Sequence, residues 1–204
     1  MKYKNIIITL SIIAVILLYC ITTGTDRSKS QDEGGVLMNG KYNVLISVQG
    51  YGDIKVELDG SAAPITVTNF INLVNQGFYD NLTFHRIMKG FMIQGGDPEG
   101  TGFGGSPNKI KGEFAENGWN NPISHTRGVI SMARATDPNS ASSQFFIVHQ
   151  DARSSLDGKY AAFGHVVSGM EVVDAIAENA RPIDNNGTIP RENQPVITSI
   201  RVVQ

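Results

Sequence analysis

The residues of this chain that are best suited to chemistry lie between Phe84 and Gly96, where Arg86 and Gln94 stand among large apolar side chains. A guanidinium stays protonated at any physiological pH and offers several N–H donors in a rigid fork. A carboxamide both donates and accepts hydrogen bonds. A few convergent polar groups on an apolar floor predict a shallow binding site for a mostly apolar ligand.

Two short strands joined by a turn are expected to carry these side chains. Alternate residues of a strand point to the same face, so we expect Phe84, Arg86 and Met88 to lie together on the first strand. Met92 and Gln94 share a face of the second strand for the same reason. The polar groups and the methionine side chains should therefore meet on one surface.

A third strand of the same kind is expected further along the chain, in the run SQFFIVH. Its alternation sends Gln144, Phe146 and Val148 to one side. Phe145 and Ile147 point to the other side. A second glutamine therefore accompanies a second apolar face.

Five motifs follow one another along the chain: FHRIMKGFMIQGGD, GVISMARA, SSQFFIVH, LDGKYAAFG and GMEVVDAI. In content, order and approximate spacing they resemble the cyclophilins, a family of peptidyl-prolyl cis-trans isomerases. The resemblance covers Lys41–Gln204. Because several independent motifs agree, the resemblance implies both the fold and the reaction of that family.

The reaction that the resemblance implies needs no nucleophile, metal or redox centre, because no bond is made or broken. A peptide C–N bond has partial double-bond character and a rotation barrier of ~18–20 kcal/mol. Bonds before proline populate both isomers and exchange over ~10–100 s. Twisting the amide returns a lone pair to the prolyl nitrogen, so a fixed cation beside it in a water-excluded site lowers the barrier.

The resemblance also implies roles for individual residues. Arg86 corresponds to the catalytic arginine that points at the prolyl nitrogen, and Gln94 to a catalytic neighbour that bonds the substrate backbone. The remaining correspondences are to substrate-binding residues along the groove and around the proline pocket: Phe91, Met92, Ala133, Gln144, Phe146, Leu156 and Tyr160.

Three positions depart from the best-known cyclophilin pattern, and one of them is Arg134, where the family often has an asparagine. Many members carry a tryptophan immediately before Leu-Asp-Gly-Lys, where this chain has Ser155. In the family that indole borders the proline pocket and contacts cyclosporin, so its absence predicts weak cyclosporin binding with isomerase activity largely kept. Tyr160 stands where animal cytosolic members have a histidine, and it keeps a ring for the pocket wall.

Composition bounds the class of protein. A chain of 204 residues with ordinary hydrophobic content is long enough for one domain with a sizeable core. A formal net charge of −2 argues against a nucleic-acid groove, which normally needs a basic face. Cys20 is the only cysteine and the four histidines lack metal-ligand spacing, so we expect no metal and no cofactor. The expected partners of this monomer are proline-containing peptides and unfolded or folding proteins.

Residues 1–21 are predicted to be a signal or membrane anchor segment rather than part of the fold. Lys2 and Lys4 precede the apolar run Ile6–Ile21. Three fates remain open: a transmembrane anchor, a lipoprotein modified at Cys20, or a signal peptide that is cleaved. Each fate sends the domain outside the cytoplasm, so we expect an extracytoplasmic protein that is membrane-attached or secreted.

Polar residues 22–40 predict a flexible linker, and the isomerase domain is expected over residues 41–204. Alternation and apolar stripes predict strands at 42–48, 54–58, 83–87, 91–94, 129–132, 144–148, 163–167 and 196–203, with helices at 64–77 and 170–178. The resemblance implies a mainly β fold, a closed eight-stranded antiparallel β-barrel capped by two α-helices. Pattern alone supports a sandwich nearly as well.

Two functions are compatible with these residues. The leading one is a peptidyl-prolyl cis-trans isomerase that assists the folding of exported proteins. The alternative is a non-catalytic module that binds proline-containing segments as a scaffold or holdase, since the same pocket would serve it. The presence of Arg86 together with Gln94 favours catalysis, because binding proline alone does not need a cation.

Overall fold

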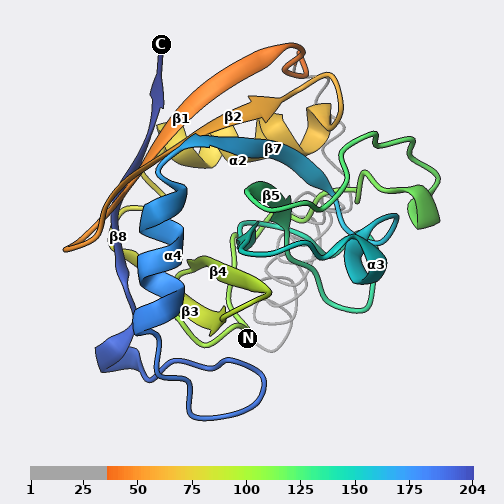
Figure 1. Cartoon of the computed structure of the whole chain (residues 1–204). Helices are drawn as coiled ribbons and strands as arrows, with labels where there is room; N and C mark the ends of the chain where they lie inside the picture. Colours follow the sequence, from red (N-terminus) through yellow and green to blue (C-terminus); the bar gives the residue numbers. More distant parts are fainter. Residues whose placement is uncertain (1–35) are drawn as a thin grey trace, which may run out of the picture. The chain divides into compact units, whose positions relative to one another are not determined.

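Eight strands close into a barrel (Figure 1), and several of them carry apolar residues at every second position. The computed structural model describes residues 36–204. In chain order the strands are β1 (Lys41–Val48), β2 (Gly52–Asp59), β3 (Leu82–Met88), β4 (Met92–Asp97), β5 (Val129–Met132), β6 (Phe145–Val148), β7 (Ala162–Ser168) and β8 (Val196–Val203).

Every strand pairs antiparallel with two neighbours, in the order β1–β2–β7–β5–β6–β4–β3–β8. The ring closes where β8 pairs with β1, from Asn43 opposite Val203 to Val48 opposite Ile197. The predicted closed eight-stranded antiparallel barrel is therefore confirmed, and a two-sheet sandwich is not the fold.

The predicted signal or anchor segment 1–21, with Cys20, and residues 22–35 of the predicted linker lie outside the described residues. Residues 38–40, which composition assigns to the linker, bond to the domain. The Met38 N–H donates to Thr68 Oγ1 (2.8 Å), and the Gly60 N–H donates to the Gly40 carbonyl (2.8 Å). Within residues 36–204, no helix combines the length and the apolar character that crossing a membrane requires.

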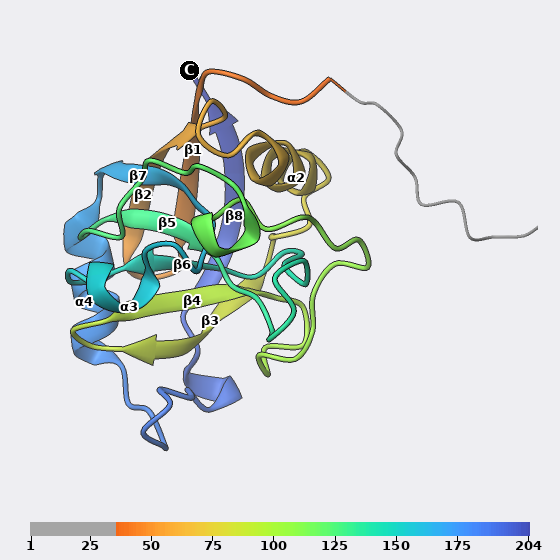
Figure 2. The same cartoon turned by 90° about the vertical axis from the view of Figure 1, so that its right-hand side faces the viewer.

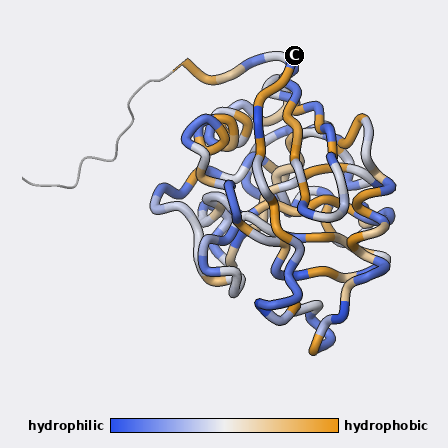
Figure 3. The backbone as a smooth tube through the Cα atoms, turned by 90° about the vertical axis from the view of Figure 1, so that its left-hand side faces the viewer, coloured by the Kyte–Doolittle hydropathy of each residue, from blue (hydrophilic) through white to orange (hydrophobic). Residues whose placement is uncertain are grey.

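Apolar side chains, several of them aromatic, fill the barrel. The Phe70 ring lies 5.0 Å from that of Tyr79, 5.5 Å from Phe145 and 5.2 Å from Phe163, measured between centroids. All four residues are fully buried. Figure 3 shows apolar segments along the strands and polar segments in many of the outer loops. The packed interior is the core that the alternation predicts.

Two helices cover the barrel, α2 (Pro64–Asn75) and α4 (Met170–Asn179), and they lie on opposite sides of it in Figure 2. Pro64 suits the first turn of α2, because its ring presets φ and a first-turn N–H has no partner within the helix. α4 buries Val173 and Ile176, as its apolar stripe predicts. Alternation did not predict the four-residue helix α3 (Arg153–Leu156).

A second apolar cluster lies on the outer face of the barrel wall. Phe145 and Ile147 of β6 join the core, whereas Phe146 and Val148 join Met92 of β4 in the outer cluster. The faces predicted for β6 are therefore confirmed. The same strands that fill the barrel also present an apolar surface outside it.

The face predicted for Phe84 is wrong. Phe84 does not share a side with Arg86 and Met88, but is fully buried in the barrel core. The cause is a β-bulge: one extra residue of β3 lies between the pairs Phe84–Gly95 and Arg86–Gln94. The extra residue shifts the alternation, so Phe84 points inward while Arg86 points outward.

The long segment between β4 and β5 caps the N-terminus of α2. The Ala63 N-cap offers no side-chain acceptor to the first turn. The fully buried Glu113 accepts instead from the Ile65 N–H (2.9 Å) and the Thr66 N–H (2.8 Å). A carboxylate at this end also interacts favourably with the helix dipole, although burial raises the pKa of Glu113 above its ordinary value. A residue distant in sequence thus supplies the missing cap.

Glu113→Ala should lower the free energy of unfolding by about 1–3 kcal/mol, because two buried backbone N–H groups lose their acceptor. Glu113→Gln keeps one acceptor oxygen and should lose less. Urea unfolding at pH 7, followed by circular dichroism, measures both variants. Equal losses in the two variants, or no loss in either, would contradict the capping role.

Candidate active site

The outer apolar cluster forms the floor of a cavity of about 380 Å³, named the apolar pocket below. Met92 of β4, Phe146 of β6 and Leu156 of α3 are each 6% exposed or less, so the floor is part of the packed structure. The residues that line the apolar pocket are Arg86, Phe91, Met92, Gln94, Gly102, Phe103, Ala133, Arg134, Phe146, Leu156, Tyr160 and Asn186.

Arg86 lies at the edge of the apolar pocket with its guanidinium held on two sides. Nε–H donates to the Asn186 carbonyl (2.7 Å), and Nη1–H donates to Gln94 Oε1 (3.0 Å). The Met88 sulfur lies 3.2 Å from Nη2, and the Met92 sulfur 3.9 Å from Nη1. One carbonyl and one amide therefore orient the cation, and polarisable sulfur packs against it.

The positive charge of Arg86 has no carboxylate partner in residues 36–204, where the ion pairs are all formed by other residues. Burial lowers the pKa of Arg86 from its ordinary value, while the negative charge of Asp184 acts in the opposite direction. A guanidinium nevertheless stays protonated near neutral pH. The apolar pocket is thus bordered by a cation whose charge is available to a ligand.

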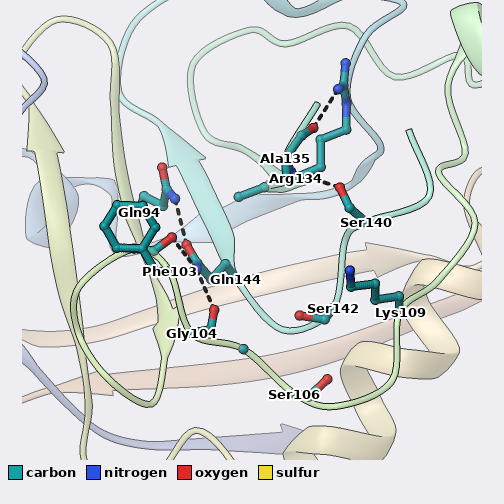
Figure 4. A pocket seen from close by; sticks show the side chains of 13 residues that line it. Gln94, Phe103, Gly104, Ser106, Lys109, Arg134, Ala135, Ser140, Ser142 and Gln144 are labelled. Atoms are coloured by element: carbon teal, nitrogen blue, oxygen red, sulfur yellow. Dashed lines mark hydrogen bonds between the residues drawn. The ribbon is translucent and has the colours of Figure 1, made fainter. Parts of the chain in front are cut away.

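Gln94 and Gln144 extend the polar side of the groove. Gln94 Nε2–H donates to Gln144 Oε1 (2.9 Å), and Gln144 Nε2–H donates to the carbonyls of Gly102 (3.0 Å) and Gly104 (2.7 Å) (Figure 4). The two carbonyls flank Phe103, which is 95% exposed. Gln144 therefore holds the backbone on both sides of an aromatic ring at the rim of the apolar pocket.

A second cavity of about 450 Å³, named the polar pocket below, adjoins the apolar pocket. The residues that line both are Gln94, Gly102, Phe103, Ala133 and Arg134. The polar pocket adds hydroxyl groups and an amine, from Ser106, Lys109, Ser140 and Ser142 (Figure 4). The two pockets together form one groove with an apolar and a polar half.

Buried polar groups pack against the Phe146 ring in the floor of the apolar pocket. The His125 ring stacks on Phe146 with centroids 6.2 Å apart; its Nδ1 lies 2.8 Å from Asp157 Oδ1 and its Nε2 lies 3.0 Å from Ser131 Oγ. Burial lowers the pKa of His125 from its ordinary value, against the effect of the Asp157 carboxylate, so the ring is neutral at pH 7. Tyr160 meets the Phe146 ring edge-on at 5.9 Å.

Arg134 holds the Tyr160 wall. Its guanidinium lies over the rings of Tyr160 and Phe114, at 4.8 and 5.0 Å from their centroids. Arg134 Nε–H also donates to the Lys159 carbonyl (2.9 Å). This arginine is therefore bound to its surroundings on several sides.

The structure brings all nine predicted site residues to the groove. Eight line the apolar pocket, and Gln144 lines the polar pocket. Ser155 is exposed on α3, lines neither pocket and donates its hydroxyl to the Ala152 carbonyl (3.0 Å). The catalytic and binding roles of the nine residues stay predictions.

Sequence reasoning did not identify the rest of the lining, and two of the missed residues matter most for the site, Phe103 and Asn186. Phe103 stands between glycines, which indicates a loop but not an exposed ring. Asn186 contributes its backbone carbonyl, which the type of residue does not reveal. Neither contribution can be inferred from the residue type alone.

The arrangement suits one kind of chemistry. A cation and two amides face an apolar floor, so the groove can hold an apolar ring while it bonds the neighbouring backbone. The cation can also stabilise electron density that develops on an atom bound beside it. Within residues 36–204, no group of three or more His, Cys, Asp or Glu residues is placed to hold a metal ion.

Comparisons with known proteins agree with this geometry. The family model described as "Cyclophilin type peptidyl-prolyl cis-trans isomerase/CLD" matches residues 43–202. Peptidyl-prolyl cis-trans isomerase A of Dickeya dadantii is 38% identical over 171 residues, which cover 79% of this chain and 85% of that protein.

Two further relatives differ in length. Peptidyl-prolyl cis-trans isomerase-like 2 of Cryptococcus neoformans is 45% identical over 134 residues, or 65% of this chain, and the chain spans only 23% of that protein. The crystal structure of a cyclophilin type peptidyl-prolyl cis-trans isomerase from Cryptosporidium parvum, in the presence of the dipeptide Ala-Pro, is similar with a TM-score of 0.69. It is 34% identical and covers 79% of this chain and 99% of its own. From the barrel, the groove and the match over residues 43–202, the chain belongs to the cyclophilin family.

Proposed function

We propose that this protein is a peptidyl-prolyl cis-trans isomerase that accelerates rotation about X–Pro bonds in peptides and in folding proteins. The observation that carries the proposal is the Arg86 guanidinium at the edge of an apolar pocket, oriented by Asn186 and Gln94. It has no carboxylate partner within residues 36–204. Membership of the cyclophilin family supports the same activity.

In the proposed mechanism the proline ring of the substrate occupies the apolar pocket, on the floor of Met92 and Phe146. Arg86 then faces the prolyl nitrogen and stabilises the lone pair that appears there when the amide twists. Gln94 bonds the substrate backbone beside it. Because planar amides offer no such lone pair, the interaction is stronger in the transition state than in either isomer, as catalysis requires.

The remaining predicted residues shape the groove around the substrate. The walls of the proposed proline site are Phe91, Ala133, Leu156 and Tyr160. Gln144 lies further along, where the chain that precedes proline would run, and it connects Gln94 to the Gly102 and Gly104 carbonyls.

A non-catalytic module that holds proline-containing segments is the second candidate. It would use the same apolar floor. A pocket that only binds proline gains nothing from a half-buried cation, whose removal from water is unfavourable. The position of Arg86 therefore favours catalysis over simple binding.

Magnetisation-exchange NMR on a short Ala-Pro peptide, with the full chain in a mild detergent, tests the two candidates. The protein should accelerate exchange at catalytic concentration. Arg86→Ala should lower kcat/KM about 10²–10³-fold, because the twisted amide loses its main electrostatic partner. Arg201→Ala is the matched control, since Arg201 forms an exposed ion pair with Asp80 and lines neither pocket.

Each outcome of this experiment distinguishes the candidates. Binding of the peptide without faster exchange would make the protein a proline-recognition module. Fast exchange that Arg86→Ala leaves unchanged would contradict the mechanism while leaving the activity. Equal losses in Arg86→Ala and Arg201→Ala would point to a general effect of removing an arginine.

We also propose that the protein works outside the cytoplasm, attached to a membrane or secreted, and assists the folding of exported proteins. The support is the sequence that precedes the domain, where Lys2 and Lys4 are followed by the apolar run Ile6–Ile21. Proline isomerisation is slow enough to limit folding, so an isomerase there would act on newly exported chains.

Mass spectrometry of the protein recovered from fractionated cells tests this location. A chain that begins at a lipidated Cys20 would identify a lipoprotein, an intact membrane-bound chain a transmembrane anchor, and a shortened soluble chain outside the cytoplasm a secreted protein. Recovery of the intact chain from the cytosol, with none in membranes, would contradict the proposal.

Cyclosporin should bind this protein weakly, because the exposed Ser155 offers no large aromatic contact beside the Leu156 wall. Ser155→Trp should tighten binding about tenfold or more, since buried tryptophans often dominate binding energy. Isothermal titration calorimetry measures both affinities. A nanomolar dissociation constant for the unmodified chain would contradict this prediction.

A further inference from the structure

The loop after α4 lies against β3 beside Arg86, and in Figures 1 and 2 it runs at the same end of the barrel as β3. β8 pairs with β3 only at Leu82 and Thr83, so this edge of β3 is open further along. The loop occupies it: the Ile87 N–H donates to the Gly187 carbonyl (2.8 Å), and the Ile189 N–H donates to the His85 carbonyl (3.0 Å).

Arg86 lies between these two backbone bonds and forms an isolated antiparallel bridge with Thr188. Its Nε–H then donates to the Asn186 carbonyl (2.7 Å), while Nη1–H donates to Gln94. Two bonds to different atoms of a planar group fix the rotation of that plane. The backbone of residues 186–188 and the Gln94 amide thus set the direction of the guanidinium.

The turn Asp184–Thr188 is itself held in shape. Asp184 Oδ1 accepts from the Asn186 N–H (2.9 Å) and the Thr188 N–H (3.0 Å), and the Gly187 N–H donates to the Asp184 carbonyl (3.2 Å). Gly187 has φ +87°, a conformation that suits glycine. A Cβ at Gly187 would lie 2.7 Å from the Ile87 carbonyl oxygen, so the turn approaches β3 as closely as glycine allows.

We propose that the turn Asp184–Thr188 is a positioning element for catalysis, which aims the Arg86 guanidinium through the Asn186 carbonyl. This inference rests on the proposed isomerase activity, and it assigns a purpose to a loop that otherwise carries no chemistry. In this proposal the turn stabilises the lone pair on the prolyl nitrogen only indirectly, by holding Arg86 in place.

Gly187→Ala tests the proposal, with Gly50→Ala as the matched control. Gly50 has a similar φ of +75°, and a Cβ there would meet nothing within 4 Å. Both variants place a Cβ on a residue with positive φ, but only the Cβ of Gly187→Ala collides with β3 and pushes the turn away from it. Gly187→Ala should lower kcat/KM about 10–100-fold, as expected when a reacting group is misplaced, and Gly50→Ala should stay near the parent value.

A double-mutant cycle separates positioning from a general structural role. In the Arg86→Ala background, Gly187→Ala should cause no further loss, because the group that the turn aims is gone. The same fractional loss with and without Arg86, or equal values for Gly187→Ala and Gly50→Ala, would overturn the proposal. Peptide KM should change less than kcat.

A second pair of variants covers the case in which Gly187→Ala does not fold. Asp184→Ala removes the acceptor that shapes the turn, whereas Asp184→Asn keeps an oxygen at that position. Asp184→Ala should lower kcat/KM and Asp184→Asn should retain most of it. Equal activity of the two variants would contradict the positioning role.

Hydrogen exchange of the Arg86 Nε–H, followed by NMR and assigned by its loss in Arg86→Ala, is independent of catalysis. Exchange should be slow in the parent chain and in Gly50→Ala, and faster in Gly187→Ala or Asp184→Ala. If the parent chain shows no isomerase activity, the proposed function fails, and this exchange still decides whether the turn holds Arg86. Unchanged exchange in the variants would overturn the proposal.

Discussion

Neighbouring side chains of a strand must point to opposite faces, and the groove depends on this constraint in β4 and β6. Ile93, Phe145 and Ile147 fill the barrel, while Met92 and Phe146 on the same strands build the floor of the apolar pocket. The register of a closed barrel is fixed by its neighbours on both sides. The part of the floor built by Met92 and Phe146 is therefore held in place by the same strands as the core.

The polar groups of the groove are held differently, because several of their hydrogen bonds run to loop backbone. Gln144 binds the Gly102 and Gly104 carbonyls, and Arg86 binds the Asn186 carbonyl. Peptide carbonyls are strong acceptors that carry no net charge. They orient the guanidinium and the amides without neutralising the cation. An aspartate or glutamate in the same place would neutralise it.

The sequence predicts most of the fold and the composition of the groove, and the failures have physical causes. Alternating apolar and polar residues in the strands and the apolar stripe of α2 are clear patterns in the sequence. The resemblance to the cyclophilins identified nine groove residues. The inward turn of Phe84 depends on a bulge, which adds one residue without any mark in composition. The Glu113 cap and the Asn186 carbonyl are contacts between distant segments, and one of them involves backbone alone.

The closed ring of strands also has a consequence for contacts with other chains. Each of the eight strands has a partner on both sides, and where β8 leaves β3 the backbone of Gly187 and Ile189 bonds that edge. Residues 36–204 therefore offer no long row of unpaired backbone groups in the barrel. An extended, aggregation-prone segment commonly adds to a free sheet edge. Here such a segment finds no free strand edge in the barrel to which it could add.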